Sequence, residues 1–171
     1  MTQIIRNTPQ GAQLVANEWT VITLAEGDDA ASVALPAGKI LVPRAVWEAQ
    51  AAQLAQRPEG TVGVWLEGFE EPVDVSTAAL VAIHFAKFAD GRGYSLAYLL
   101  RNRQGYRGEL RAFGDVGRDQ LNYLSRSGFD SFALRETETP ETAITSLHDF
   151  TEPYQGTAYD ARPLWQRVAR G

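Results

Sequence analysis

Hydrophobic residues gather along the chain in short runs separated by polar, helix-like stretches. Six runs suit strands, at residues 19–24, 39–42, 61–66, 79–85, 108–113 and 129–134. The fourth run, Ala-Leu-Val-Ala-Ile-His-Phe, barely alternates between apolar and polar residues. Such a run is typical of a strand that is covered on both faces.

Between these runs the sequence carries helix signals. A helix over 44–56 follows Pro43 and ends before Pro58, and a helix over 95–104 ends at Gly105. Asp115 suits the N-cap of a third helix that stops at Gly128. Thr139-Pro140-Glu141 predicts the start of a fourth, because threonine caps, proline fits the first turn and glutamate suits the positive helix end.

Strands that alternate with helices are joined by crossover connections and therefore run parallel. The predicted fold class is α/β, with a mainly parallel sheet that forms either a partial barrel or an open sheet. We expect a single α/β domain over 1–155 and a C-terminal tail over 156–171, because the sequence after Phe150 is polar and contains proline.

The composition of the 171 residues sets further limits. A hydrophobic content of 44% with 22% charged residues is that of a globular protein. No apolar run is long enough to cross a bilayer, and the first residues lack the pattern of a signal peptide, so we expect a cytoplasmic protein without a membrane partner. The net charge of −5 argues against general binding to nucleic acid.

Charge is unevenly distributed along the chain. Residues 1–89 carry 5 basic and 10 acidic side chains, whereas residues 90–130 carry 7 basic and 5 acidic ones. All seven of those cations are arginine, which suits planar, bidentate recognition of anions. The middle of the chain is therefore the predicted place for a small anionic ligand.

Cysteine is absent from the chain. A thiolate nucleophile, a zinc site with cysteine ligands and an iron–sulfur cluster held by cysteines are all excluded, because each needs a cysteine sulfur. His84 and His148 show no metal-ligand spacing, so no metal site is predicted. Any redox role would require a borrowed cofactor, whose identity the sequence leaves unknown.

In parallel α/β folds, ligands bind at the carboxyl ends of the strands. The loops that follow the fourth and fifth predicted strands are rich in acids, arginines and glycines. The predicted catalytic residues are Asp90, Tyr94 and Asp115, and the predicted ligand-binding residues are Gly91, Arg92, Gly93, Ser95, Arg118 and Asp119. The alternative for each is structural: Asp115 and Ser95 as helix caps, and Arg118 with Asp119 as a solvated first turn.

Gly91-Arg92-Gly93 partly matches a dinucleotide fingerprint, but Leu96 stands in place of the third glycine. Five residues also separate the preceding strand from Gly91, which spoils the tight turn that pyrophosphate binding needs. A glycine-rich loop before an ordinary helix is the simpler interpretation.

A longer string of residues resembles one bacterial family. It comprises Phe85-Ala-Lys-Phe-Ala-Asp-Gly-Arg-Gly-Tyr-Ser, Leu100-Arg101, Gly105-Tyr106, Gly108-Glu109-Leu110-Arg111-Ala112, Gly114-Asp115-Val116, Arg118-Asp119-Gln120-Leu121 and Gly128-Phe129-Asp130. Over about residues 80–134 the chain is similar to domain of unknown function 934, often labelled "oxidoreductase probably involved in sulfite reduction". Relatives often carry Arg-Cys-Gly-Phe where this chain has Arg126-Ser127-Gly128-Phe129.

The resemblance implies a role in assimilatory sulfate or sulfite reduction, and three functions stay open. The chain is expected to be an accessory protein with a small-anion or phosphorylated-ligand site at the strand carboxyl ends. The alternatives are a non-catalytic binding partner of sulfite reductase and an oxidoreductase that uses a borrowed nicotinamide or flavin. Whether the protein is an enzyme stays undecided at this point.

Overall fold

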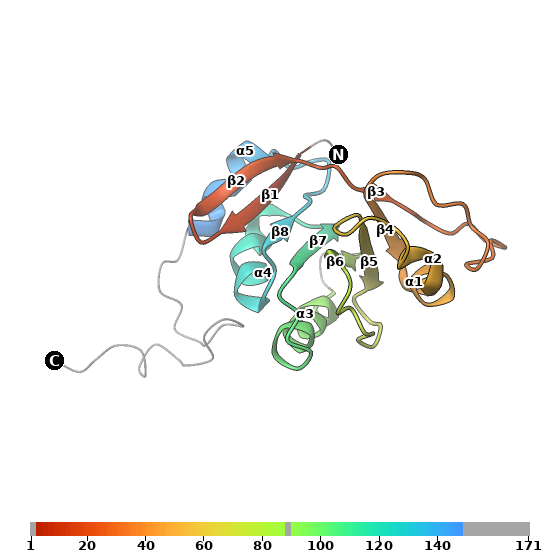
Figure 1. Ribbon diagram of the computed structural model, residues 1–171. Helices are drawn as coiled ribbons and strands as arrows, with labels where there is room; N and C mark the ends of the chain where they lie inside the picture. The colour runs from red at the N-terminus through yellow and green to blue at the C-terminus, as the bar shows by residue number, and fades with distance from the viewer. Residues whose placement is uncertain (1–2, 88–89, 149–171) are drawn as a thin grey trace.

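The computed structural model describes residues 3–87 and 90–148 (Figure 1). Eight strands form one curled sheet, a half-barrel, in the order β2-β1-β8-β7-β6-β5-β4-β3. The strands are β1 (Gln3–Thr8), β2 (Gly11–Ala16), β3 (Thr20–Val21), β4 (Ile40–Pro43), β5 (Val62–Glu67), β6 (Leu80–Phe85), β7 (Glu109–Gly114) and β8 (Ser131–Phe132). The predicted α/β class with a mainly parallel sheet is confirmed, and the sheet is a partial barrel.

The strands from β3 to β8 lie side by side in chain order, and each runs parallel to the next. Right-handed crossovers between consecutive neighbours place the connections on the same face of a sheet. The connecting helices accordingly lie on the convex face. In Figure 1 the helices over 92–102 and 121–127 are seen below the strands, and the helix over 140–143 lies near the top, beside the N-terminal strands. No helix of the described residues covers the concave face.

The N-terminal hairpin β1–β2 is antiparallel and extends the sheet through an antiparallel pairing of β1 with β8. The sequence patterns above did not predict it. Its ladder runs from Gln3 opposite Ala16 to Thr8 opposite Gly11, and Gly11 takes the positive φ of 117° that the tight turn requires. The hairpin closes one edge of the parallel sheet.

The first predicted helix is divided in two in the structure. In place of one helix over 44–56 there are α1 (Arg44–Ala49) and α2 (Ala51–Leu54). The break lies at Gln50, whose φ of −110° and ψ of 23° are not helical. Its side-chain amide donates hydrogen bonds to the carbonyl oxygens of Ala30 and Val33, at 2.8 and 3.0 Å, so tertiary contacts override the local helix pattern.

The prediction of Asp115 as an N-cap is wrong. The helical segment after β7 begins as a 3₁₀ turn, η1 (Arg118–Gln120), and Gly117 occupies the cap position. It continues as α4 (Leu121–Ser127), which ends as predicted at Gly128 with a φ of 114°. Asp115 instead uses its carboxylate to pair with Arg135.

The remaining elements follow the predicted order with shifted ends. The helix α3 (Arg92–Asn102) begins three residues before the predicted start at Ser95. Thr139 lies at the N-cap of α5 (Pro140–Ala143), which is followed by η2 (Ile144–His148). Only Thr20–Val21 of the predicted strand 19–24, and Ser131–Phe132 of 129–134, form strand pairings.

The main core lies between the sheet and the helices. Alternate strand residues point into it, so Val64, Leu66, Val81, Ile83 and Phe85 are buried there with the apolar faces of α3 and α4. The opposite residues of the same strands face the concave side. A second, smaller cluster under α1 and α2 contains Ile40, Val42, Val46, Leu54 and Val62.

In the described part of the chain, no helix is long and apolar enough to cross a membrane. The predicted tail over 156–171, and the end of the predicted domain at residue 155, lie outside the described residues.

Candidate functional site

A row of polar and aromatic side chains crosses the concave face at the carboxyl ends of the strands. Glu67 on β5 is in register with His84 on β6, and His84 with Phe113 on β7. Their neighbours along the strands, Leu66 and Ile83, are buried in the helix-side core. Since side chains alternate along a strand, the three residues of the row share the concave face.

His84 and Glu67 form the central pair of this row. Nδ1 of the imidazole lies 3.0 and 3.1 Å from the two carboxylate oxygens of Glu67. The side chains are 30% and 27% exposed, so the pair is neither buried in the core nor fully solvated. A carboxylate at Nδ1 holds the neutral ring in the tautomer that donates from Nδ1 and accepts at Nε2.

Nε2 of His84 is directed away from this carboxylate, and within residues 3–87 and 90–148 no group forms a hydrogen bond with it. A histidine held by a carboxylate at one nitrogen and open at the other is the arrangement that enzymes use to accept or donate a proton. The same nitrogen, when protonated, donates a hydrogen bond to an anion.

Aromatic rings fix the plane of the imidazole. The ring centroid of Phe113 lies 4.9 Å from that of His84, and Trp65 contacts His84 edge-on at 6.0 Å. Trp65 is itself anchored, because its indole N–H donates to the carbonyl oxygen of Ile22 at 2.9 Å. The orientation of Nε2 is therefore built into the sheet.

Gly114 leaves room beside the imidazole. A Cβ atom at this position would lie 2.7 Å from Cδ2 and 3.0 Å from Nε2 of His84, and 2.5 Å from the carbonyl oxygen of Phe85. Its φ of +98° also favours glycine. The absence of a side chain at Gly114 thus keeps the ring and Nε2 accessible.

Of the predicted residues, Asp90 and Arg92 form a local ion pair. The guanidinium lies 2.6 Å from one carboxylate oxygen through Nη2 and 2.8 Å from the other through Nε, and the backbone N–H of Arg92 also donates to Asp90. The Arg92 side chain lowers the pKa of Asp90 to about 2, so this group is a carboxylate throughout the physiological range. Arg92 is 63% exposed and its guanidinium lies 5.1 Å above the ring of Phe69.

The two glycines beside Arg92 have different roles. Gly91 is the N-cap of α3, and a Cβ there would meet nothing within 4 Å. Gly93 is packed against Phe85, whose Cζ would lie 2.7 Å from an added Cβ. Gly93 therefore serves helix–sheet packing, and Ser95 lies inside α3 rather than at its cap. The loop does not fit the tight turn of a dinucleotide site.

Tyr94 and its partners belong to the helix side. The Tyr94 hydroxyl accepts a hydrogen bond from the side-chain amide of Gln120 at 3.2 Å, and its ring packs between Phe85 and Tyr123. Burial raises the pKa of Tyr94. Arg118 and Asp119 lie on the exposed surface of η1, next to this contact.

Asp115 belongs to a third group, at the ends of β7 and β8. Arg135 reaches Asp115 at 3.2 Å and Glu138 at 2.9 Å. The hydrogen bonds that Arg135 donates to Glu138 first, and then to Asp115, raise the pKa of Arg135. Among the described residues, no hydrogen bond or ion pair joins Asp90, Tyr94 and Asp115 to one another. The predicted residues therefore form three neighbouring groups on one edge rather than one cluster.

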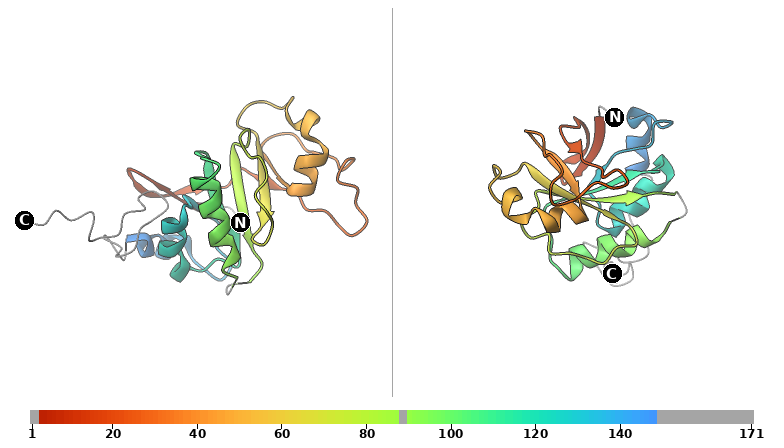
Figure 2. Two further views of the ribbon diagram at one scale, coloured as in Figure 1. Left: turned by 90° about the horizontal axis from the view of Figure 1, so that it is seen from below. Right: turned by 90° about the vertical axis from the view of Figure 1, so that its right-hand side faces the viewer.

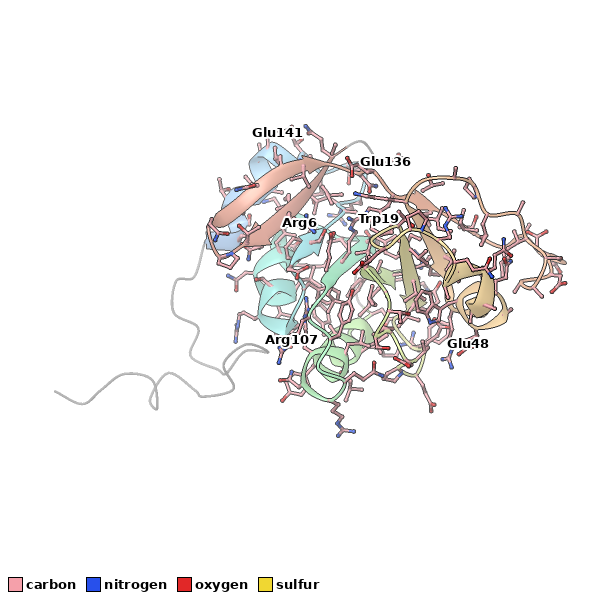
Figure 3. All side chains as sticks on the ribbon, in the orientation of Figure 1. Arg6, Trp19, Glu48, Arg107, Glu136 and Glu141 are labelled. Atoms are coloured by element: carbon pink, nitrogen blue, oxygen red, sulfur yellow. The ribbon has the colours of Figure 1, made fainter. Side chains whose placement is uncertain are left out.

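A separate polar network lies toward the amino ends of the strands on the same concave face. Arg111 is 4% exposed and donates hydrogen bonds to Glu109, Asn17 and Ser131. Arg6 pairs with Glu109, and Figure 3 shows Arg6 on the side of the sheet opposite Arg107. Arg6, Glu109 and Arg111 line a cavity of about 340 Å³. All the nitrogens of the Arg111 guanidinium are bonded, so this network is structural.

Glu67, Trp65 and His84 were not predicted as site residues from the sequence, where His84 was considered only for metal-ligand spacing. The alternation in Val62–Glu67 places Trp65 and Glu67 on one face, which is a signal present in the sequence. Their partnership with His84 depends on which strands are neighbours and on register. The described residues contain no group of three or more side chains suited to hold a metal ion.

Comparison with known proteins identifies a family. A family model described as "Bacterial protein of unknown function (DUF934)" matches residues 63–165, which is more than half of the chain. Neither the curated proteins nor the solved structures contain a match to this chain. The matched segment begins within β5 and includes Glu67, His84 and Gly114, and the chain belongs to the DUF934 family.

Proposed function

We propose that this protein is an accessory protein of assimilatory sulfate or sulfite reduction that binds a small anionic or phosphorylated ligand at the carboxyl ends of its parallel strands. The pathway rests on the resemblance to a family that is often labelled as involved in sulfite reduction. The site rests on one observation, which is His84 held by Glu67 with Nε2 open to the concave face.

The position of the pair supports ligand binding. The carboxyl ends of parallel strands are where helix N-termini and loops converge, and half-barrel and barrel folds bind their ligands there. His84 and Glu67 are placed at this edge by the in-register ends of β5 and β6. The surrounding Trp65 and Phe113 provide an apolar wall, and an apolar wall strengthens a hydrogen bond between imidazole and anion.

The chemistry of the pair suits an oxyanion that exchanges a proton. Protonated Nε2 donates to the anion while Glu67 stabilises the imidazolium, and neutral Nε2 accepts a proton from the ligand. Sulfite is such an oxyanion, because it exchanges a proton with water near neutral pH. Arg92, the first residue of α3, and Arg135, which follows β8, lie at the same edge and supply positive charge at the rim, although each is already paired with a carboxylate.

The test uses the fact that the chain has two histidines, His84 and His148. In a His148→Gln variant, the only imidazole signals in a nuclear magnetic resonance spectrum come from His84. Sulfite, sulfate, inorganic phosphate and adenosine monophosphate are titrated separately. A saturable shift of the His84 signals with at least one of them supports the proposal, and no shift with any of the four at millimolar concentration overturns it.

Two variants separate the site from its rim. His84→Gln is expected to abolish binding of the anion that shifts the ring, whereas Arg92→Ala is expected to weaken binding without loss of folding, measured by circular dichroism. Unchanged binding in His84→Gln would show that the ligand does not bind at His84 on the concave face. Unchanged binding in Arg92→Ala would show that this exposed arginine is not part of the site.

The pathway needs a genetic test. A strain that lacks this protein is expected to grow poorly on sulfate and on sulfite and to recover on sulfide. If the His84→Gln variant still supports full growth on sulfate and co-purifies with sulfite reductase, the non-catalytic partner is favoured instead. A bound chromophore in the absorption spectrum of the purified protein would favour an oxidoreductase with a borrowed nicotinamide or flavin.

A further inference from the structure

The helix layer on the convex face has a gap above β5 and β6. The connection between these parallel strands, residues 68–79, contains no helix, whereas the connections on either side carry α1 with α2 and α3. The left view of Figure 2 shows the strands visible between α3 and the α1–α2 pair. In parallel sheets, crossover helices normally cover the faces of the sheet. The connection between β5 and β6 departs from this pattern because it has no helix.

A groove lies beside the connection, and we name it the α1–α2 groove. It has a volume of about 610 Å³. Its lining residues are Trp47, Glu48, Ala51, Leu54, Ala55, Arg57, Pro58, Glu59, Gly60, Val62, Val73, Asp74, Ser76 and Thr77. Leu54, Val62 and Val73 are buried and form an apolar floor.

The walls of the groove are open to solvent. Ala51 and Ala55, four residues apart on and after α2, are exposed, and so is Pro58. Trp47 closes one end by donating a hydrogen bond from its indole to the carbonyl oxygen of Asp74 at 3.2 Å. A pocket for a small molecule encloses most of its ligand, whereas a groove with exposed walls can receive one face of a helix.

The charge around the groove is acidic. Glu48, Glu59 and Asp74 line it with Arg57 as the single cation among the lining residues. Glu48 already pairs with Arg44 at 3.0 Å, so Glu59 and Asp74 are the acids that remain for a partner. The guanidinium of Arg57 is directed to other acceptors, because its Nη2 donates to the carbonyl oxygens of Pro36 and Gly38 at 2.7 and 2.8 Å. The half of the chain that builds the groove, residues 1–89, has twice as many acidic as basic side chains. A partner that fits this rim carries lysine or arginine.

We propose that the α1–α2 groove is the docking site for one amphipathic helix of a partner protein, with apolar residues on the face that enters the groove and basic residues beside them. The apolar face packs on Leu54, Val62 and Val73 in the position where the sheet lacks its own crossover helix. The basic residues pair with Glu59 and Asp74. This surface is on the opposite face of the sheet from His84, so it goes beyond the proposed ligand site.

The chain offers a matched pair of positions for testing the groove. Ala51 lines it and Ala52 does not, although both are exposed alanines in the same short helix. The probe is a synthetic helix with leucines at positions i, i+3, i+4 and i+7 and lysines at its polar positions. A second peptide replaces each lysine with glutamate, and binding to the full chain is measured by fluorescence anisotropy.

We expect the lysine peptide to bind, the Ala51→Lys variant to weaken it about tenfold or more, and Ala52→Lys to change it by less than about twofold. The glutamate peptide should bind at least about tenfold more weakly than the lysine peptide. Equal loss in Ala51→Lys and Ala52→Lys, or equal affinity for both peptides, overturns the proposal. Circular dichroism of both variants confirms that they fold.

The natural partner is sought by cross-linking in the native cells. A photoreactive amino acid is placed at position 51 or, as the control, at position 52. A cross-link from position 51 alone, mapped by mass spectrometry to a helical segment with basic residues, supports the proposal. A cross-link to a second copy of this chain, or to a small molecule, or equal cross-linking from both positions, overturns it. The nuclear magnetic resonance titration of His84 is independent of all these outcomes. Failure of the groove proposal can therefore be distinguished from failure of the proposed ligand site.

Discussion

The two faces of the sheet differ in how completely their buried and half-buried basic side chains are hydrogen-bonded. On the helix side, Arg101 is 4% exposed and every nitrogen of its guanidinium is bonded: to Gly128, Tyr106 and Gly108 through their carbonyl oxygens, and to the Asp130 carboxylate at 2.8 Å. On the concave side, His84 has one bonded nitrogen and one open nitrogen. A saturated group stabilises a fold, whereas an open one is available to a ligand.

This difference explains why one string of residues marks the family. Arg101, Gly108, Gly128 and Asp130 belong to the segments that resemble it, and the structure shows them as one clamp that joins α3 to the starts of β7 and β8. Asp130 also accepts the backbone N–H of Leu110 at 2.8 Å. These residues stabilise the fold, whereas Glu67 and His84 form the site that we propose for the ligand.

Breaking the clamp should have the largest effect. Arg101→Ala leaves a mostly buried Asp130 carboxylate and three carbonyl oxygens without their donor, so we expect the free energy of unfolding to fall by about 3–5 kcal/mol. Chemical denaturation measures the change. Arg103→Ala, two residues further along at an exposed position, is the control. A loss below about 1 kcal/mol in Arg101→Ala would contradict the role of the clamp.

Filling the space beside His84 should have the next largest effect. Gly114→Ala combines a φ of +98° with close contacts to Phe85 and His84, and we expect a loss of about 2–4 kcal/mol. Gly105→Ala shares the positive φ, of +67°, but meets nothing within 4 Å, so it should lose only about 1–2 kcal/mol. Equal losses in thermal or chemical denaturation would mean that the contacts to His84 are unimportant.

Removing the charge of Glu67 should leave the fold almost intact and change the imidazole. In Glu67→Gln, the amide no longer holds the proton on Nδ1, so the nitrogen-15 signals of His84 should shift from a single tautomer toward a mixture. Both side chains are about one-quarter to one-third exposed, and we expect a loss of stability of no more than about 1 kcal/mol. Unchanged tautomer signals would show that Glu67 does not orient His84.

Much of this fold follows from local patterns, but the site does not. The order of strands and helices, the stop at Gly128 and the parallel sheet come from hydrophobic runs and glycines that act within a few residues. The break at Gln50 and the pairing of Glu67 with His84 depend on contacts 17 or more residues apart in the chain. Asp90 and Arg92 lie near the carboxyl ends of the strands, as the sequence predicts, but there they form an ion pair with each other.

The pair of Asp90 and Arg92 gives the smallest expected effect. The folded pKa of Asp90 is lowered from 3.8 to about 2 by Arg92, so the pair stabilises the protein above the unfolded value and this contribution is lost as the pH falls from about 4 to about 2. Asp90→Asn should lower the denaturation midpoint slightly near neutral pH, leave it unchanged at about pH 2, and so flatten its dependence on pH in that window. Because both groups are at the surface, the change is expected to shrink further in high salt. A difference of the same size at about pH 2, or in high salt, would show that the charge of Asp90 is not the source of the stabilisation.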